Sequence, residues 1–433
     1  MHNIPVNAPR RRLLAALALG ASAPFASGAS PAADERIASG APGQVADARG
    51  CAVPIGGALR FDNATVWSRL VALSGGAGSN WVVLGTAAEQ PGHAAAQVVD
   101  VLRRHGAQAE ALDVAPGAGA AAAVRDTALI AQVGAARGVF FCGGAQERIV
   151  DTLMPGGVDT PLLSAIRAVP SRGGVVAGTS AGAAIMSTTM FRDAQDVLTV
   201  LKGQLRPGRE IDRGLGFVGS RLFVDQHFLR RGRIGRMLPM MVASGYTLGL
   251  GVDENTAAIV RGDDIEVIGG KGALLVDLSE ARHAPVGGAV ALQGARLSYL
   301  DRGDRYDLAA RRFIPSPQKL ADHAIDPNAR DFQPYFPRAR FWADILGDTT
   351  IVNAMSELMD SPAREAFGLA ADLRPLPTDA RPDLAFEFRL HKGADSLAWF
   401  TGAFGGEDYS VSNLRLDVRP VRLAQPLYKP WEA

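Results

Sequence analysis

Short apolar runs alternate with segments of helical periodicity along the first half of the chain. Residues 81–86 (WVVLGT), 139–144 and 174–178 read as buried strands, and apolar residues at helical spacing follow each of them. Strands that alternate with helices are typical of a parallel sheet covered by helices on both faces. The pattern therefore predicts an α/β fold of three layers, α/β/α, built on a mainly parallel sheet.

The pattern changes in the second half of the chain. Residues 249–278 contain closely spaced strands, including a hairpin over residues 258–268. Beyond residue 307 several prolines interrupt the pattern, and strand-like alternation returns at residues 385–390 and 414–418. We interpret residues 51–306 as the main domain and residues 307–433 as a C-terminal extension or small β-containing domain.

The N-terminal residues resemble an export signal. Three arginines, Arg10–Arg12, precede an apolar stretch over residues 13–19, and small residues follow as far as residue 28. This order is typical of a secretory signal peptide, and the consecutive arginines also suit the twin-arginine type. We predict a signal peptide over residues 1–28, a linker over residues 29–50 and a periplasmic or secreted protein.

Composition narrows the choice of partners. The 433 residues include 45 basic and 44 acidic side chains, and removal of the signal would leave a net charge of −2. A near-neutral chain has no overall field for nucleic acid, so we expect no nucleic-acid partner. No apolar run reaches the roughly 18–20 residues that span a bilayer, so we expect no membrane partner.

The cysteines and histidines are too few and too scattered for a metal site. Cys51 and Cys142 are the two cysteines, and no two histidines have the i, i+4 spacing of a helical zinc site. We therefore expect neither a metal nor another cofactor. After export the two thiols could form one disulfide or remain as two buried thiols, and the sequence leaves both readings open.

A serine at the end of a predicted strand is the first candidate for chemistry. Residues 178–182 (GTSAG) place Ser180 in a G-x-S-x-G motif directly after the apolar run 174–178. A nucleophile on a tight strand-to-helix turn needs small neighbours, and the backbone N–H of Ala181 would face a developing oxyanion. A serine that only caps the following helix fits the same segment equally well.

A serine nucleophile needs a base and a carboxylate that orients the base. His227 differs from the other histidines because it follows a predicted strand at residues 222–224, and Asp253 and Glu254 follow the strand at residues 248–252. Functional residues collect at the carboxyl ends of parallel strands. As a second choice for the acid, the chain offers two aspartates that would give the residue order of α/β-hydrolases, Asp193 and Asp196.

Three blocks of sequence together resemble the cyanophycinases, serine peptidases of the dipeptidase E clan with a fold similar to class I glutamine amidotransferases. The blocks are residues 178–183 (GTSAGA), 225–228 (DQHF) and 251–257 (GVDENTA). The resemblance covers roughly residues 51–305, with a loop at residues 140–146 where Ala145 replaces the usual asparagine. The C-terminal extension lies outside it.

The resemblance implies roles for individual residues. It implies that Ser180 is the nucleophile, His227 the base and Glu254 the orienting acid, with Gly144 and Ala181 forming the oxyanion hole. It also implies a substrate pocket lined by Gln146, Asp225, Gln226, Arg231, Arg233 and Arg236. The implied reaction releases β-aspartyl-arginine dipeptides from cyanophycin, a poly-aspartate chain bearing arginine, through an acyl-enzyme, and the implied assembly is a homodimer.

Four arginines follow His227 within ten residues, at positions 230, 231, 233 and 236. A solvated helix face is the usual fate of such a charge run, whereas a cluster that binds substrate carboxylates is the functional reading, because arginine binds carboxylates bidentately. Two other functions remain open, a dipeptidase for short aspartyl peptides and a non-catalytic binding module. The intact set of Ser180, His227 and Glu254 argues against the second.

Overall fold

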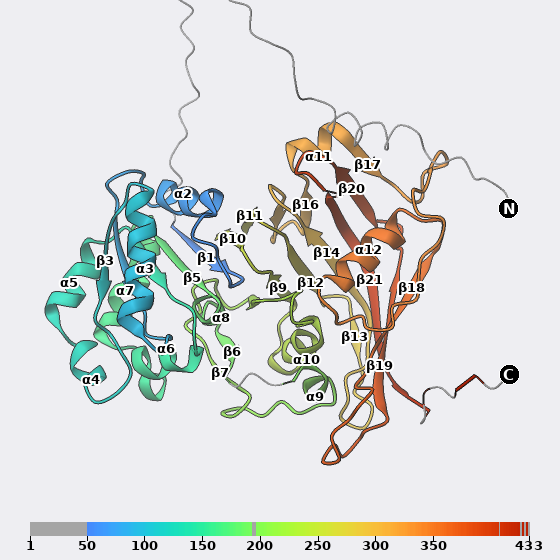
Figure 1. The fold of residues 1–433 in the computed structure, drawn as a ribbon, viewed down its shortest axis with the longest axis horizontal. Helices are drawn as coiled ribbons and strands as arrows, with labels where there is room; N and C mark the ends of the chain where they lie inside the picture. The colour runs from blue at the N-terminus through green and yellow to red at the C-terminus, as the bar shows by residue number, and fades with distance from the viewer. Residues whose placement is uncertain (1–49, 193–195, 407, 425–426, 428–429, 432–433) are drawn as a thin grey trace, which may run out of the picture.

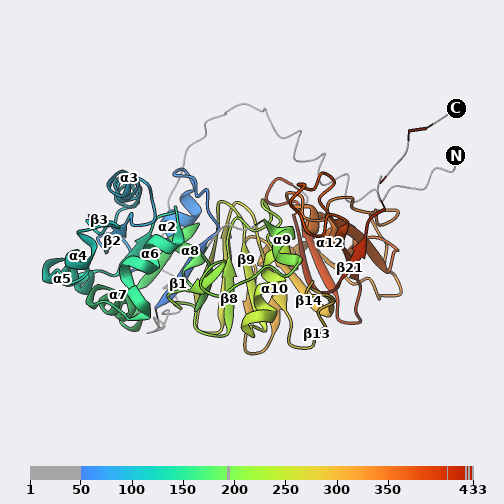
Figure 2. The same cartoon turned by 90° about the horizontal axis from the view of Figure 1, so that it is seen from below.

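The computed structural model describes residues 50–192, 196–406, 408–424, 427 and 430–431. The predicted signal peptide, nearly all of the predicted linker and Asp193 lie outside the described residues. The molecule is elongated, with its N-terminal half at one end and the C-terminal extension at the other (Figures 1 and 2).

A mixed sheet of nine strands combines five strands from residues 51–179 with four from residues 256–314. Five adjacent strands are parallel, in the order β1 (Cys51–Ile55), β5 (Val175–Thr179), β4 (Gly138–Phe141), β2 (Asn80–Leu84) and β3 (Gln108–Leu112). On the other side of β1 the sheet continues with antiparallel strands, β10 (Thr256–Arg261), β11 (Asp264–Gly269), β15 (Arg305–Asp307) and β16 (Arg312–Ile314).

Helices cover both faces of the parallel strands, because successive residues of each strand point into different cores. In β2 the side chains of Val82 and Val83 enter opposite cores. One core includes α5 (Thr127–Ala135), α6 (Gln146–Leu153), α7 (Pro161–Ser171) and α8 (Ala181–Ala184). The other includes α2 (Ala64–Leu73) and α3 (Pro91–Arg104). The predicted α/β/α architecture is confirmed.

A second sheet joins the main chain to the extension. Its path begins with β8 (Leu222–Asp225), β9 (Leu248–Val252), β12 (Ala273–Asp277) and β14 (Leu292–Leu300). It continues with β21 (Asp408–Arg422), β20 (Leu397–Thr401) and β17 (His323–Ile325), and three more strands pair alongside, β13 (Arg282–His283), β18 (Glu365–Ala370) and β19 (Leu384–His391). The extension therefore supplies extra strands, as expected. It shares this sheet with the strands that precede it, and the expected boundary after residue 306 falls inside β15.

Helices α10 (Ile234–Ser244) and α12 (Thr350–Met359) pack on the second sheet within one hydrophobic core, which includes Met237, Met355 and Phe388. The shorter elements are α4 (Ala120–Ala123), α9 (Val197–Leu201), α11 (Pro317–Asp322), β6 (Thr189–Phe191) and β7 (Ile211–Arg213). None of the helices in the described part of the chain combines the length and apolarity that a bilayer crossing requires.

The two cysteines are not bonded to each other. Cys51 and Cys142 are free thiols and both are buried. Burial raises the pKa of Cys142 to about 12, which keeps this thiol protonated. Of the two readings left open by the sequence, the structure has the two buried thiols.

Candidate active site

Ser180 occupies a strained turn between β5 and α8. Its backbone has φ +53° and ψ −108°, a conformation that a residue with a side chain keeps only when its surroundings enforce it. The flanking glycines are required for space: a Cβ on Gly178 would lie 2.5 Å from the carbonyl oxygen of Gly182, and a Cβ on Gly182 would lie 2.4 Å from that of Phe141. The Ser180 side chain makes no capping hydrogen bond to α8, so it is not a helix cap.

His227 follows β8 and also has a positive φ, +46°. Its backbone N–H donates to the carbonyl oxygen of Gly56, at 2.6 Å. Its ring lies against Gly57, where a Cβ would come within 2.3 Å of the imidazole Nε2. Of the two glycines after β1, Gly56 therefore holds the backbone of His227 and Gly57 leaves room for its imidazole.

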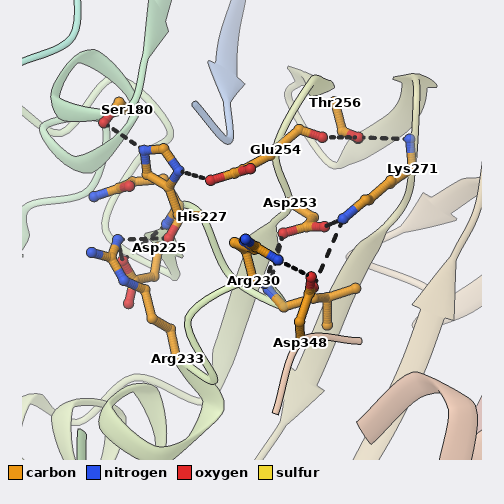
Figure 3. A network of polar contacts seen from close by, with 12 residues as sticks. Ser180, Asp225, His227, Arg230, Arg233, Asp253, Glu254, Thr256, Lys271 and Asp348 are labelled. Carbon is orange, nitrogen blue, oxygen red and sulfur yellow. Dashed lines mark hydrogen bonds and ion pairs between the residues drawn. The ribbon is translucent and has the colours of Figure 1, made fainter. Parts of the chain in front are cut away.

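A chain of hydrogen bonds connects the serine, the histidine and an acid (Figure 3). The Oγ of Ser180 lies 2.9 Å from Nε2 of His227, and Nδ1 of His227 lies 2.6 Å from Oε1 of Glu254. Glu254 lies in the turn from β9 to β10, and the next residue, Asn255, donates its N–H to the carbonyl oxygen of Gly57, at 2.8 Å. The turn from β9 to β10 is thereby hydrogen-bonded to Gly57, the residue against which the imidazole of His227 lies.

The other acids considered from the sequence have different partners. Asp253 is fully buried and accepts the backbone N–H groups of Leu229 and Arg230. Asp196 caps α9 by accepting the N–H of Thr199, at 2.9 Å. Within the described residues, Glu254 is the acid that contacts His227.

The surroundings of His227 favour its neutral form. Burial lowers the pKa of His227 below its ordinary value of 6.5, and the charges on Arg231 and Arg233 lower it further, whereas the hydrogen bond that His227 donates to Glu254 opposes this shift. With Nδ1–H donated to Glu254, the free electron pair of Nε2 faces the Ser180 hydroxyl. The imidazole can therefore accept the hydroxyl proton at neutral pH.

Backbone N–H groups are available beside the serine. Gly143 lies so close that a Cβ there would be 3.2 Å from the Cβ of Ser180, and Gly144 has a φ of +146°. No backbone acceptor in the described part of the chain takes the N–H of Gly143, Gly144 or Ala181. Gly144 and Ala181 are the residues expected for an oxyanion hole. Gly143 was not singled out from the sequence, although it belongs to the same loop.

A buried ion cluster lies next to the histidine. Arg236 donates from Nε and Nη2 to the two carboxylate oxygens of Asp225, at 2.7 and 2.5 Å, and its guanidinium stacks on the ring of Phe191. Burial by itself would raise the pKa of Asp225, but Arg236 and Arg233 outweigh it and hold this pKa below its ordinary value. Burial lowers the pKa of Arg233 to about 9, and Arg233 donates to the carbonyl oxygen of Gln226.

The reading of the four arginines as a solvated helix face is thus wrong for Arg233 and Arg236, which are 5% and 2% exposed. The Nε–Nη2 edge of the Arg236 guanidinium already binds Asp225, and its face lies on Phe191, so Arg236 belongs to the wall of the site. Arg231 is exposed, and no ion pair or hydrogen bond in the described residues engages its guanidinium. It is the arginine of the cluster that is free to meet a ligand.

The two glutamines expected in the pocket are both buried. Gln146 donates from Nε2 to the carbonyl oxygen of Phe191, at 2.7 Å. Gln226 is 4% exposed, and its Oε1 has no hydrogen-bond partner in the described part of the chain. The described residues contain no group of three or more His, Cys, Asp or Glu side chains arranged to hold a metal ion.

Serine hydrolases have this arrangement: a serine on a strand-to-helix turn is hydrogen-bonded to a histidine, and the histidine is hydrogen-bonded to a carboxylate. Comparison with known proteins narrows this class. The model of peptidase family S51 matches residues 56–268. The chain is 34% identical to the cyanophycinase of Trichormus variabilis over 199 residues, which cover 44% of this chain and 63% of that protein.

A second relative is the cyanophycinase of Geminocystis herdmanii, 35% identical over 176 residues, which cover 39% of this chain and 61% of that protein. The chain thus spans less than two thirds of the length of either relative. A solved structure of a peptidase from an acI-B1 Actinobacterium aligns with a TM-score of 0.44 at 18% identity, over 60% of this chain and 97% of that one. Residues 56–268 thus match the model of peptidase family S51, and this match and the two relatives support a serine peptidase.

Proposed function

We propose that the protein is an exported serine exopeptidase that hydrolyses cyanophycin to β-aspartyl-arginine dipeptides. The observation that carries the proposal is the continuous hydrogen-bonded chain from Ser180 through His227 to Glu254. The assignment to peptidase family S51 and the two cyanophycinase relatives support the same reaction and substrate.

In the first half of the reaction Ser180 Oγ attacks the scissile carbonyl carbon while Nε2 of His227 takes the hydroxyl proton. Glu254 stabilises the imidazolium that forms. The oxyanion accepts the N–H groups of Gly144 and Ala181, with the positive end of α8 adding to their effect. When the tetrahedral intermediate collapses, the C–N bond breaks and His227 gives its proton to the leaving amine, which leaves an acyl-enzyme ester on Ser180.

In the second half His227 takes a proton from water, and the resulting hydroxide equivalent attacks the ester carbonyl. The same N–H groups stabilise the second oxyanion. Collapse breaks the bond to Ser180 Oγ, and the proton on Nε2 returns to the serine oxygen. The net reaction consumes one water per amide bond and restores the neutral histidine.

Arg231 supplies the recognition of charge in this proposal. Each arginine branch of cyanophycin carries a free α-carboxylate. Arg231 lies one turn after the histidine, because its backbone N–H donates to the carbonyl oxygen of His227, at 3.1 Å, and its guanidinium has no partner among the described residues. Gln226, whose buried Oε1 has no partner among the described residues, would offer an acceptor to a guanidinium or amide N–H of the substrate once its side chain turns toward the site.

The test is incubation of the purified protein with insoluble cyanophycin, followed by mass spectrometry of the soluble products. The proposal predicts β-aspartyl-arginine as the main product, and none from the Ser180→Ala variant. Hydrolysis of short aspartyl peptides without release from the polymer would favour the dipeptidase reading. Polymer binding without hydrolysis by the wild type would favour the non-catalytic reading.

We also propose that residues 1–28 export the protein, because their basic, apolar and small-residue segments match a signal peptide. Fractionation of cells and N-terminal sequencing of the mature protein test this, and an intact N-terminus in the cytoplasmic fraction would contradict it. We further propose that the protein forms a homodimer, as the resemblance to the cyanophycinases implies. Light scattering of the purified protein tests this, and the mass of a monomer would contradict it.

A further inference from the structure

The turn after His227 is held from two sides. On one side the buried carboxylate of Asp253 accepts the N–H groups of Leu229 and Arg230, at 3.1 and 3.2 Å. On the other side the extension packs directly against the turn, since a Cβ on Gly232 would lie 2.3 Å from the carbonyl oxygen of Leu346. A segment about 120 residues farther along the chain therefore contacts the backbone that follows the histidine.

Asp348 joins these two sides by charge (Figure 3). One of its carboxylate oxygens lies 2.5 Å from Nη1 of Arg230, and the other lies 4.0 Å from Nζ of Lys271. Lys271 is in turn 2.8 Å from Oδ2 of Asp253. Asp348 is thus the acid of the extension that meets both cations around the Asp253–Glu254 turn.

The network also reaches the backbone of Glu254. The backbone N–H of Lys271 donates to Oγ1 of Thr256, at 2.9 Å. The Thr256 hydroxyl in turn donates to the backbone carbonyl oxygen of Glu254, at 3.1 Å. Movement of Lys271 would therefore be transmitted to the residue that orients His227.

This network matters because the site is strained. His227 keeps its positive φ only as long as its neighbours leave it no alternative. The buried carboxylate of Asp253 needs its cation, because an uncompensated buried charge is strongly unfavourable. An anchor that holds Lys271 and Arg230 in place limits how far either side of the turn can relax.

We propose that Asp348 is a positioning residue for the His227–Glu254 pair, acting through Arg230 and Lys271. The proposal rests on the proposed function, since it assumes that His227 activates Ser180. It gives the C-terminal extension, which lies outside the region matched by the family, a part in the chemistry without contact with substrate.

The test measures the rate at which a fluorophosphonate labels Ser180, because this reagent reports on the serine and its base whatever the natural substrate is. The variants are Asp348→Asn, Asp348→Glu and a control, Asp383→Asn. Asp383 is also in the extension and pairs with Arg422, and its side chain is 41% exposed against 37% for Asp348. We expect Asp348→Asn to label about five- to tenfold more slowly, Asp348→Glu to recover most of the rate and the control to match wild type.

Two further measurements separate positioning from a loss of folding. Melting temperatures should agree within about 2 °C among the variants, because half-exposed ion pairs add little stability. In the Arg230→Gln background, Asp348→Asn should slow labelling by a smaller factor than in the wild type, since the contact with Arg230 is already lost and only the one with Lys271 remains to be broken. The proposal would be overturned if Asp348→Asn were labelled at the wild-type rate, or if Asp348→Glu did not recover the rate. It would also be overturned if the losses in the double variant were additive, or if labelling slowed in proportion to a fall in melting temperature.

The outcomes also distinguish this proposal from the proposed function. A wild-type protein that is labelled but releases nothing from cyanophycin contradicts only the substrate, and the labelling rates still decide the role of Asp348. A wild-type protein that is not labelled contradicts the serine mechanism, and the positioning role with it.

Discussion

Ser180, His227 and Asn255 each hold a positive φ, and all three lie at or beside the hydrogen-bonded chain. Such conformations cost about 1–3 kcal/mol each for residues with side chains. They persist here because the backbone of Ile55, Gly56 and Gly57 accepts an N–H from each of them. At the scale of single residues, the backbone of residues 55–57 therefore imposes the geometry of the site.

Replacement of Ser180 by alanine should remove activity by a factor of about 10³ or more, because the nucleophile is lost and the remaining members cannot substitute for it. Stability should be unchanged, since alanine fits the same turn. Initial rates of dipeptide release and thermal melting curves check both statements. Ser171→Ala, at an exposed serine ending α7, is the control and should retain full activity. Retained activity in Ser180→Ala would remove the serine mechanism.

Glu254→Gln should lower the catalytic rate, whereas Asp196→Asn should affect only stability. Glu254→Gln leaves His227 without its anion and should lower kcat by roughly 10³–10⁴, by analogy with other triads. Asp196→Asn weakens only the cap of α9, at a stability cost of about 1 kcal/mol or less, with kcat unchanged. Steady-state kinetics and denaturant unfolding measure the two quantities, and the reverse pattern would reassign the acid.

Activity should rise with pH as His227 loses its proton, because only the neutral imidazole accepts the serine proton. Since the pKa of His227 is lowered in the folded protein, half of the maximal kcat/KM should be reached below pH 6.5. Arg231→Gln removes a charge that lowers this pKa, so its profile should move up by roughly a few tenths of a pH unit. Arg104→Gln, at an exposed arginine ending α3, is the control. A midpoint above 7 in wild type would contradict the argument.

At the scale of elements, the site forms where two sheets approach each other. Ser180 follows β5 of the first sheet, His227 follows β8 of the second, and Glu254 lies in the turn that carries the chain from β9 of the second sheet to β10 of the first. The buried pair of Asp225 and Arg236 then fastens α10 to the end of β8. Each functional residue is thus positioned by the secondary-structure element or elements that flank it in the chain.

Arg236→Ala should destabilise the protein by about 3–5 kcal/mol, because it leaves the buried carboxylate of Asp225 without its main partner. Arg231→Ala, five residues away and exposed, should change stability by less than about 0.5 kcal/mol. Urea unfolding of both variants measures the difference. Equal small losses would mean that the Asp225–Arg236 pair is not what fastens α10 to β8.

At the scale of the whole molecule, the extension is part of the fold that carries the site. Strand β21 pairs with β14 over residues that precede the extension, and Leu297 of β14 and Leu416 of β21 belong to one core. The same sheet continues through β12 and β9 to β8, which ends at the active site. Removing the extension would uncover this core.

A chain ending at residue 306 should therefore be insoluble or unfolded, because β14 would keep β12 but lose β21 and become an exposed edge strand, and the core would lose the side chains of the extension. A chain ending at residue 424 keeps β21 and should match the full chain in solubility and melting temperature. Soluble yield and circular dichroism measure both. A folded, active protein ending at residue 306 would show that the extension is a separate unit.

Much of the first half of the fold could be predicted because its signals are local. Apolar runs such as residues 81–84 and 174–178 read as buried strands, and the small residues around Ser180 indicated a sharp turn. The burial of Arg233 and Arg236 could not be predicted in the same way. A run of arginines reads as a solvated face until the partner that neutralises it, here Asp225 eleven residues before Arg236, is placed in space.

Neighbouring residues and motifs were enough to predict the alternation of strands and helices, the order of serine, histidine and acid along the chain, and the resemblance to the cyanophycinases. The tertiary fold was needed to settle which acid meets His227, which of the four arginines are buried and that the thiols are free. It also decided that a segment near Asp348 rests on the turn after the histidine. These are contacts between residues far apart in sequence, and their free energy depends on burial and distance, which no local pattern encodes.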